Sequence, residues 1–103
     1  KINFISNKTI SSKILDFKKI NLRSKMDGII CIENADPGYD FLFSKNIKGL
    51  ITKYGGQNSH MAIRCAELNL PALIGVGEKV YNKILENKYV KIDCNLKKID
   101  FIN

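Results

Sequence analysis

The chain has 103 residues and a mass of 11.7 kDa, which is enough for one small domain and too little for two. Hydrophobic residues make up 45% and charged residues 26%, values that exclude a disordered tail. No apolar run approaches the roughly 20 residues that cross a bilayer, so we expect no membrane partner. No Walker loop is present, and the length cannot hold a nucleotide-binding fold together with an acceptor site. Any catalysis would therefore take place as part of something larger.

The formal net charge of +7 raises the hypothesis of nucleic-acid binding. However, 15 of the 17 basic residues are lysines, and they are scattered along the chain. They form no stripe of arginines and aromatic residues that could follow a phosphate backbone. We therefore expect no nucleic-acid partner, and the charge fits phosphorylated small molecules equally well.

The three cysteines, Cys31, Cys65 and Cys94, are odd in number and far apart. This spacing is neither a disulfide framework nor a metal-binding Cys-x-x-Cys pair, so it favours a reducing, cytoplasmic setting. With His60 as the single histidine, we expect no metal site.

Short apolar runs alternate with glycines and polar turns along the whole chain. The predicted strands cover residues 1–5, 28–32, 50–52, 73–76, 89–92 and 99–102. Helices are predicted at residues 59–68, ended by Asn69 and Pro71, and at 80–85. Residues 8–24 leave helix and strand open, and Asp36 with Pro37 forms a turn that can also start a helix. The pattern predicts an α/β fold with a mixed sheet, closed by a hairpin around residues 93–98.

The chemistry-bearing segment follows the predicted strand at residues 50–52. Gly55 and Gly56 allow positive φ and let main-chain N–H groups approach an anion closely. Asn58 or Ser59 can cap the helix that follows, and the positive end of the helix dipole favours a negative group there. His60 stands at this point, and imidazole is a nucleophile that can take up phosphate and pass it on. We therefore predict that His60 carries phosphate and that these four neighbours bind it.

The predicted helix has two different faces. His60, Arg64 and Glu67 lie at i, i+4 and i+7 and form one polar stripe, which directs His60 to solvent or a partner. Arg64, one turn from His60, joins the predicted phosphate-binding residues. The apolar neighbours are expected to pack on the sheet: Met61, Ala62, Cys65, Ala66 and Leu68.

The segment GGQNSHMAI at residues 55–63, then Glu67, then LPALIG at residues 70–75, resembles the phosphohistidine domain of phosphoenolpyruvate (PEP)-utilising enzymes. That family includes phosphoenolpyruvate synthase, pyruvate phosphate dikinase, Enzyme I of the sugar phosphotransferase system and rifampicin phosphotransferase. Asp36, Pro37 and Asp40 resemble the acidic, proline-containing entry that follows the family's second strand. The resemblance implies a swivelling β/β/α domain over residues 1–103, the C-terminal part of a larger multidomain phosphotransferase.

The resemblance also implies a reaction. The histidine that matches His60 accepts phosphate, by analogy the β-phosphate of ATP, and carries it to an acceptor by rigid-body rotation. Mg²⁺ and ATP are then expected in a partner domain of the same polypeptide, and this domain holds no cofactor. The segment at residues 55–64 is similar to the glutamine kinase branch, which phosphorylates a side-chain amide for capsule phosphoramidate. An amide, an alcohol and pyruvate all stay open as small-molecule acceptors.

The sequence departs from the family pattern at two places. Asn58 stands where the family usually has Thr, and Cys65 and Ala66 stand where it has Ala and Arg, so that Arg64 supplies the basic side chain. A second hypothesis is a non-catalytic interaction module that keeps the swivelling fold. Phosphate labelling separates the two, because only a carrier must become phosphorylated at His60.

Overall fold

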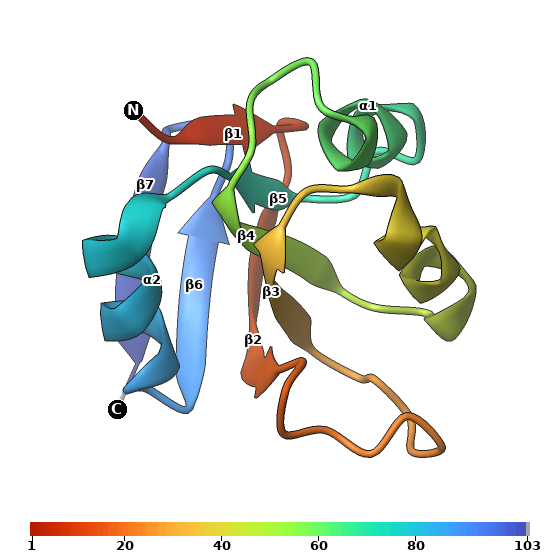
Figure 1. Cartoon of the computed structure of the whole chain (residues 1–103). Coiled ribbons are helices and arrows are strands. Elements are labelled where there is room, and N and C mark those ends of the chain that lie inside the picture. Colours follow the sequence, from red (N-terminus) through yellow and green to blue (C-terminus); the bar gives the residue numbers. More distant parts are fainter. Residues whose placement is uncertain (103) are drawn as a thin grey trace.

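Seven strands form one mixed sheet in the computed structural model, which describes residues 1–102. The strands are β1 (Asn3–Ile5), β2 (Thr9–Asp16), β3 (Ile29–Asn34), β4 (Gly49–Tyr54), β5 (Ala72–Ile74), β6 (Tyr89–Asp93) and β7 (Lys98–Ile102). Their order across the sheet is β1-β5-β4-β3-β2-β6-β7 (Figure 1). β2 to β5 pair in parallel, while β1, β6 and β7 add antiparallel edges. The predicted α/β fold with a mixed sheet and a closing hairpin is confirmed.

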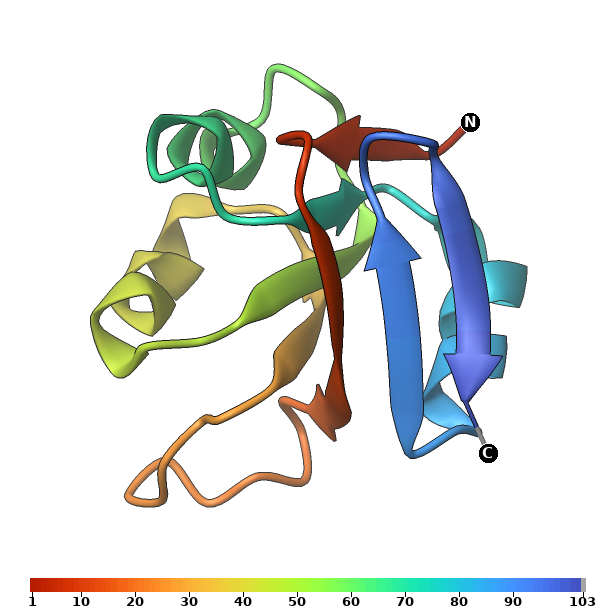
Figure 2. The same ribbon diagram turned by 180° about the vertical axis from the view of Figure 1, so that it is seen from behind.

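The sheet changes partners halfway along β2. Residues 9–13 of this strand pair with β6, and residues 14–16 pair with β3. The sheet therefore curls at β2, and the β6–β7 hairpin stands apart from the parallel centre (Figure 2). This strand lies in the part of the sequence where helix and strand were left open.

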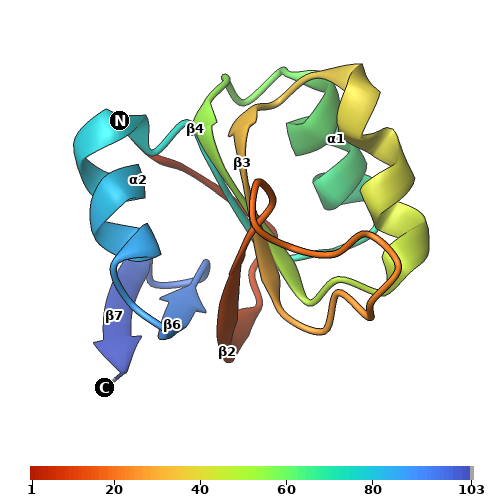
Figure 3. The same cartoon turned by 60° about the horizontal axis from the view of Figure 1, so that its bottom comes forward.

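Three short helices cover the two faces of the parallel centre. The 3₁₀-helix η1 (Pro37–Lys45) and α1 (His60–Glu67) lie on one face, and α2 (Gly77–Leu85) lies on the other with the hairpin (Figure 3). Asp36 starts η1 as the sequence allowed, since its Oδ1 accepts a hydrogen bond from the Gly38 N–H at 2.8 Å. No helix within residues 1–102 is long and apolar enough to cross a membrane.

Two hydrophobic cores lie on opposite sides of the parallel strands. Alternation along β3 feeds both cores, because Ile30 and Ile32 point to the α1 side while Ile29 and Cys31 point to the α2 side. Met61, Ala62 and Cys65 of α1 complete the first core, and Tyr81 and Ile84 of α2 complete the second. Each helix is thereby fixed to the sheet by a narrow apolar stripe.

The C-terminal end of α1 corrects part of the predicted packing. Ala66 is exposed and Leu68 is 48% exposed, so neither packs on the sheet as expected. The helix ends at Glu67, one residue before the predicted end, and Asn69 adopts a left-handed φ of 52°. The N–H of Leu70 then reaches the carbonyl of Cys65 at 2.9 Å, which is a Schellman arrangement. This reversal brings Leu70 back onto the first core in place of Leu68.

Candidate functional site

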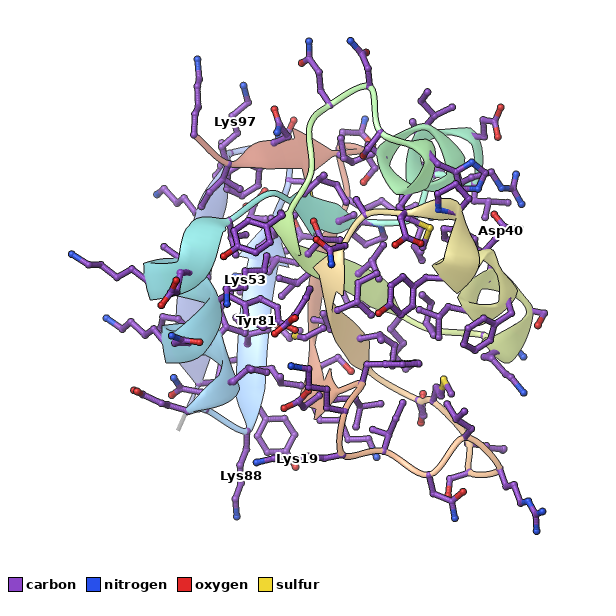
Figure 4. The ribbon with its side chains drawn as sticks, in the orientation of Figure 1. Lys19, Asp40, Lys53, Tyr81, Lys88 and Lys97 are labelled. Carbon is purple, nitrogen blue, oxygen red and sulfur yellow. The ribbon has the colours of Figure 1, made fainter. Side chains whose placement is uncertain are left out.

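The candidate site lies where η1 and α1 leave the sheet. β3 and β4 are parallel neighbours, so the segments that follow them emerge at the same edge. η1 follows β3 and carries Asp40, and α1 follows β4 and begins at His60. Figure 4 shows Asp40 on the side of η1 that faces α1. Residues 20 positions apart in sequence are thereby placed side by side.

The loop before α1 depends on one of its two glycines for its shape. Gly55 has a φ of 132°, and a Cβ there would lie 2.6 Å from the Cβ of Ala35. Gly55 therefore fits the predicted need for a residue without a side chain. Gly56 does not have the predicted positive φ, and a Cβ there would meet nothing within 4 Å. The turn is made at Gly55, which leaves the main chain at Gly56 open to its surroundings.

Ser59, one of the two predicted capping residues, is the N-cap of α1. Its Oγ accepts a hydrogen bond from the Ala62 N–H at 3.4 Å and donates one to the Gly56 carbonyl at 2.7 Å. Asn58 is exposed and does not cap the helix. This cap takes up the Ala62 N–H, and the N–H groups of the helix that precede Ala62 have no intrahelical acceptor and can contact an anion.

His60 contacts a carboxylate that the sequence did not place in the site. Its Nε2 lies 2.8 Å from Oδ1 of Asp40, and Nε of Arg64 donates to the same oxygen at 3.3 Å. The three side chains are 37%, 47% and 35% exposed, so the cluster is reachable from outside. The polar stripe on α1 is formed as predicted, since Nη1 of Arg64 also contacts Oε1 of Glu67 at 3.1 Å.

The charges of this cluster support one another. The hydrogen bond from His60, and then the hydrogen bond and charge of Arg64, hold the pKa of Asp40 below its usual value. Hydrogen bonds to Glu67 and Asp40 raise the pKa of Arg64 further above its usual range. The guanidinium carbon of Arg64 lies 5.3 Å from the centre of the Phe43 ring, which adds a cation–π contact. Arg64 is therefore a fixed positive charge within one helical turn of the imidazole.

The three cysteines, Cys31, Cys65 and Cys94, are free thiols and are buried. Desolvation raises the pKa of Cys65 to about 12, and that of Cys31 to about 12 as well. Both groups stay protonated at neutral pH and lie inside the cores. The side chain of His60, by contrast, is 37% exposed, which agrees with the polar stripe predicted for α1.

The site is a surface, and a separate hollow of ≈180 Å³ contains none of its residues. That hollow is lined by Lys25, Met26, Asp27, Lys45 and Asn46. Within residues 1–102, no three His, Cys, Asp or Glu side chains are grouped to hold a metal ion. The cluster presents an imidazole, a guanidinium and a helix N-terminus to whatever approaches, which suits transfer of an anionic group.

Of the predicted site residues, His60 and Arg64 meet at Asp40, and Ser59 is hydrogen-bonded to the carbonyl of Gly56. Gly55, Gly56 and Asn58 all lie in the exposed loop before α1. Asp40 is the residue that sequence reasoning missed. A signal was available, because Asp40 follows Pro37 in the segment that resembles the family's acidic entry, and that segment follows a strand parallel to β4. Only the fold shows that its carboxylate reaches His60.

Comparison with known proteins gives a family match over most of the chain. The model of the PEP-utilising enzyme mobile domain matches residues 25–96. A phosphoenolpyruvate-protein phosphotransferase of Mycoplasma genitalium is 32% identical over 73 residues, 70% of this chain and 13% of the relative. Rifampicin phosphotransferase of Bacillus cereus is 42% identical over 64 residues, 61% of this chain and 7% of the relative. The chain thus spans about an eighth or less of the length of these relatives.

Proposed function

The chain belongs to the family of PEP-utilising enzyme mobile domains, and from this premise we propose that His60 is the residue that carries a phosphoryl group within a phosphotransferase. Domains of this family carry phosphate on histidine and deliver it elsewhere in the enzyme. The observation that supports His60 is its position: a partly exposed imidazole at the first residue of α1, after a glycine loop and one helical turn from Arg64. This chain is one such carrier and depends on other domains for its substrates.

Transfer takes place in two steps. An imidazole nitrogen of His60 attacks phosphorus, a P–N bond forms, and the bond from phosphorus to the leaving group breaks with its electron pair on that group. The phosphoryl group then lies by the N-terminus of α1, where open N–H groups and Arg64 offset its charge. In the second step the acceptor attacks phosphorus, the P–N bond breaks, and neutral imidazole is restored. The chain thus returns to its starting state.

We propose that the donor is ATP, with the β-phosphate passing to His60 and AMP and phosphate leaving. PEP is the alternative donor. By analogy with the family, we place the nucleotide and the Mg²⁺ that accompanies it in a partner domain of the same polypeptide. For the acceptor we propose the side-chain amide of glutamine, ahead of an alcohol or pyruvate.

The surface around His60 supports docking to such partner domains. Ile63, in the first turn after His60, is 48% exposed, and Leu68, directly after the end of α1, is 48% exposed as well. Exposed apolar side chains next to a partly exposed reactive group fit a face that is covered in turn by different domains.

The test is intact-mass measurement of the full polypeptide that contains this chain, after incubation with Mg-ATP or with PEP. We expect the gain of one phosphoryl group that is labile in acid, stable in base and absent from His60→Ala. Acceptor screening then starts with glutamine and pyruvate. No gain with either donor contradicts the carrier function and leaves the interaction module as the better hypothesis.

A further inference from the structure

The contact between Asp40 and the tip of the His60 ring is not explained by the carrier function alone. Nε2, the ring atom farthest from the main chain, lies 2.8 Å from Oδ1 of Asp40. Arg64 reaches the same oxygen at 3.3 Å, so one carboxylate oxygen serves both side chains. A carboxylate therefore occupies the end of the ring to which a phosphoryl group would be added.

The contact fixes where the imidazole carries its proton. The pKa of Asp40 is held below its usual value by His60 and Arg64, so the group is a carboxylate at neutral pH and can only accept hydrogen bonds. Neutral imidazole in this contact must donate from Nε2, which leaves its lone pair on Nδ1. While the contact lasts, Nε2 has no free lone pair and cannot attack phosphorus.

Nε2 is nevertheless the nitrogen that a donor in another domain can reach more easily. Nδ1 is bonded to Cγ, next to the Cβ and the main chain of the first residue of α1. Nε2 lies at the far end of the ring, and the side chain of His60 is 37% exposed. A donor and an acceptor bound in separate domains both need the exposed end of the ring, and this is the end that Asp40 holds.

We propose that Asp40 is a positioning residue that latches His60 before phosphorylation, and that the imidazole must leave this carboxylate for phosphoryl transfer at Nε2. The proposal rests on the proposed function. After transfer, the negative phosphoryl group on Nε2 and the carboxylate of Asp40 repel each other, so the latch cannot close again. Loss of the phosphoryl group restores the contact, and the position of the ring therefore follows its phosphorylation state.

The steps balance without a change in the protonation of Asp40. When the ring turns away, solvent gives a proton to Nδ1 and takes the proton of Nε2. The lone pair of Nε2 then forms the P–N bond while the leaving group departs with its electron pair. Nδ1 keeps its proton, and the positive charge of the ring is offset by the phosphoryl oxygens.

Arg64 is placed to serve both states. In the latched state its guanidinium contacts Asp40 at one nitrogen and Glu67 at another. Its stacking on Phe43 keeps the group beside the head of α1 when the contacts change. When His60 leaves Asp40, Arg64 stays within reach of the freed carboxylate and of the incoming phosphoryl group. Arg64 thus stabilises the carboxylate of Asp40 after His60 has left it, and it also stabilises the phosphoryl group on His60.

The latch can be tested on the chain without its partner domains, using phosphoramidate as a small phosphoryl donor. The phosphoryl group then passes from the nitrogen of phosphoramidate to the imidazole. The P–N bond of phosphoramidate breaks, and its nitrogen takes up a proton and leaves as ammonia. Rate and final extent of phosphorylation are measured by intact mass for the native chain, Asp40→Asn and Asp36→Asn. Asp36→Asn is the matched control, because it removes the same charge from the start of η1 and asparagine still caps a helix.

We expect Asp40→Asn to be phosphorylated roughly three- to fivefold faster than the native chain and to a higher final extent, the range that suits a half-exposed ion pair. Asp36→Asn should match the native chain. A slower reaction of Asp40→Asn, or a rate equal to that of Asp36→Asn, overturns the latch. Thermal melting of each variant shows that the fold is retained, and Asp40→Ala repeats the measurement without an amide that could hold the ring.

The position of the phosphoryl group gives a second readout that a merely structural role would not move. In the full polypeptide labelled with ¹⁵N-histidine and phosphorylated by its own donor, ³¹P–¹⁵N coupling should place phosphorus on Nε2. Phosphorus on Nδ1 overturns the latch, since Asp40 could then hold Nε2 throughout the reaction. Absence of donor-dependent phosphorylation contradicts the carrier function instead, while the phosphoramidate comparison still decides on Asp40.

Discussion

α1 and α2 are preceded by similar segments of chain but carry different side chains at their N-termini. α1 follows β4 and α2 follows β5, both strands are buried and parallel, and a glycine with positive φ lies between strand and helix in each case. Ser59 caps α1 through its side chain, and His60, Arg64 and Asp40 gather there. α2 has no side-chain cap hydrogen bond.

Side chains on α2 serve packing. Tyr81 is 4% exposed, burial raises its pKa, and Lys53 lies 6.0 Å from the centre of its ring (Figure 4). The two helix starts are also in contact, because a Cβ on Gly75 would clash with the carbonyl of Gly55. A glycine loop before a helix is therefore an architectural feature of this fold. The side chains at the start of α1 provide the candidate site. The loop before α2 packs against the loop before α1 and helps to hold its shape.

The largest expected effect is on phosphorylation, and it should be seen for a substitution at the start of α1 and not for one at the start of α2. His60→Ala is expected to abolish donor-dependent phosphorylation of the full polypeptide, because it removes the proposed nucleophile. Lys79→Ala, in the first turn of α2, should leave phosphorylation at the native level. Both are measured by intact mass. Equal loss in the two variants would mean that the helix starts are not different in function.

The contact between the two loops predicts the largest effect on stability. Gly75→Ala places a side chain at a φ of 74° and against the carbonyl of Gly55. We expect a loss of about 2 to 4 kcal/mol in the free energy of unfolding, since backbone strain and overlap both contribute. Gly56→Ala is the control and should change it by less than about 0.5 kcal/mol, since nothing lies within 4 Å of its added Cβ. Urea denaturation measures both, and similar losses would show that the loops do not support each other.

The helix starts also show what the sequence could and could not reveal. Strands such as β3 and β4 were predictable, because apolar β-branched runs between glycines carry a local signal. The start of α1 was predictable for the same reason, since Ser59 and Asn69 mark its ends. β2 was not, because its alternation is weak and its two partners, β3 and β6, are distant in sequence.

The misses at the site are also matters of tertiary structure. Asp40 reaches His60 only because parallel pairing of β3 and β4 brings the following segments to one edge. Leu70 packs on the first core in place of Leu68 because Asn69 reverses the chain. Both residues are leucines, so residue type alone could not show which of them would be buried. Gly56 was expected to share the role of Gly55, yet adjacent glycines have identical sequence signals and different backbone geometry.

A smaller effect comes from the side-chain cap that α1 has and α2 lacks. Ser59→Ala removes the acceptor for the Ala62 N–H and the donor to the Gly56 carbonyl. We expect a loss of about 1 kcal/mol in the free energy of unfolding, which is typical of an N-cap. Ser59→Thr keeps the hydroxyl and should retain most of the stability. If the threonine variant loses as much as the alanine variant, the hydroxyl is not what stabilises the start of α1.

The smallest effect is the dependence of stability on pH through Asp40. Its pKa in the folded chain is lowered from 3.8 by His60 and then by Arg64, so the folded state favours the carboxylate more than the unfolded state does. The stabilisation is therefore complete above about pH 4, the unfolded value, and is lost as the pH falls through the lower folded value. Melting temperatures of the native chain and Asp40→Asn should differ at neutral pH and converge in acid.

The same comparison in a chain that also carries His60→Ala and Arg64→Gln isolates the cause. Without its two partners, Asp40 has no reason to favour the carboxylate in the folded state, so Asp40→Asn should have the same effect at neutral and acid pH. If Asp40→Asn still lowers the melting temperature of this double variant at neutral pH and not in acid, the cause of the lowered pKa of Asp40 lies outside the cluster. α2 has no such cluster at its start, so this part of the pH response belongs to the contact between Asp40 on η1 and the two side chains on α1.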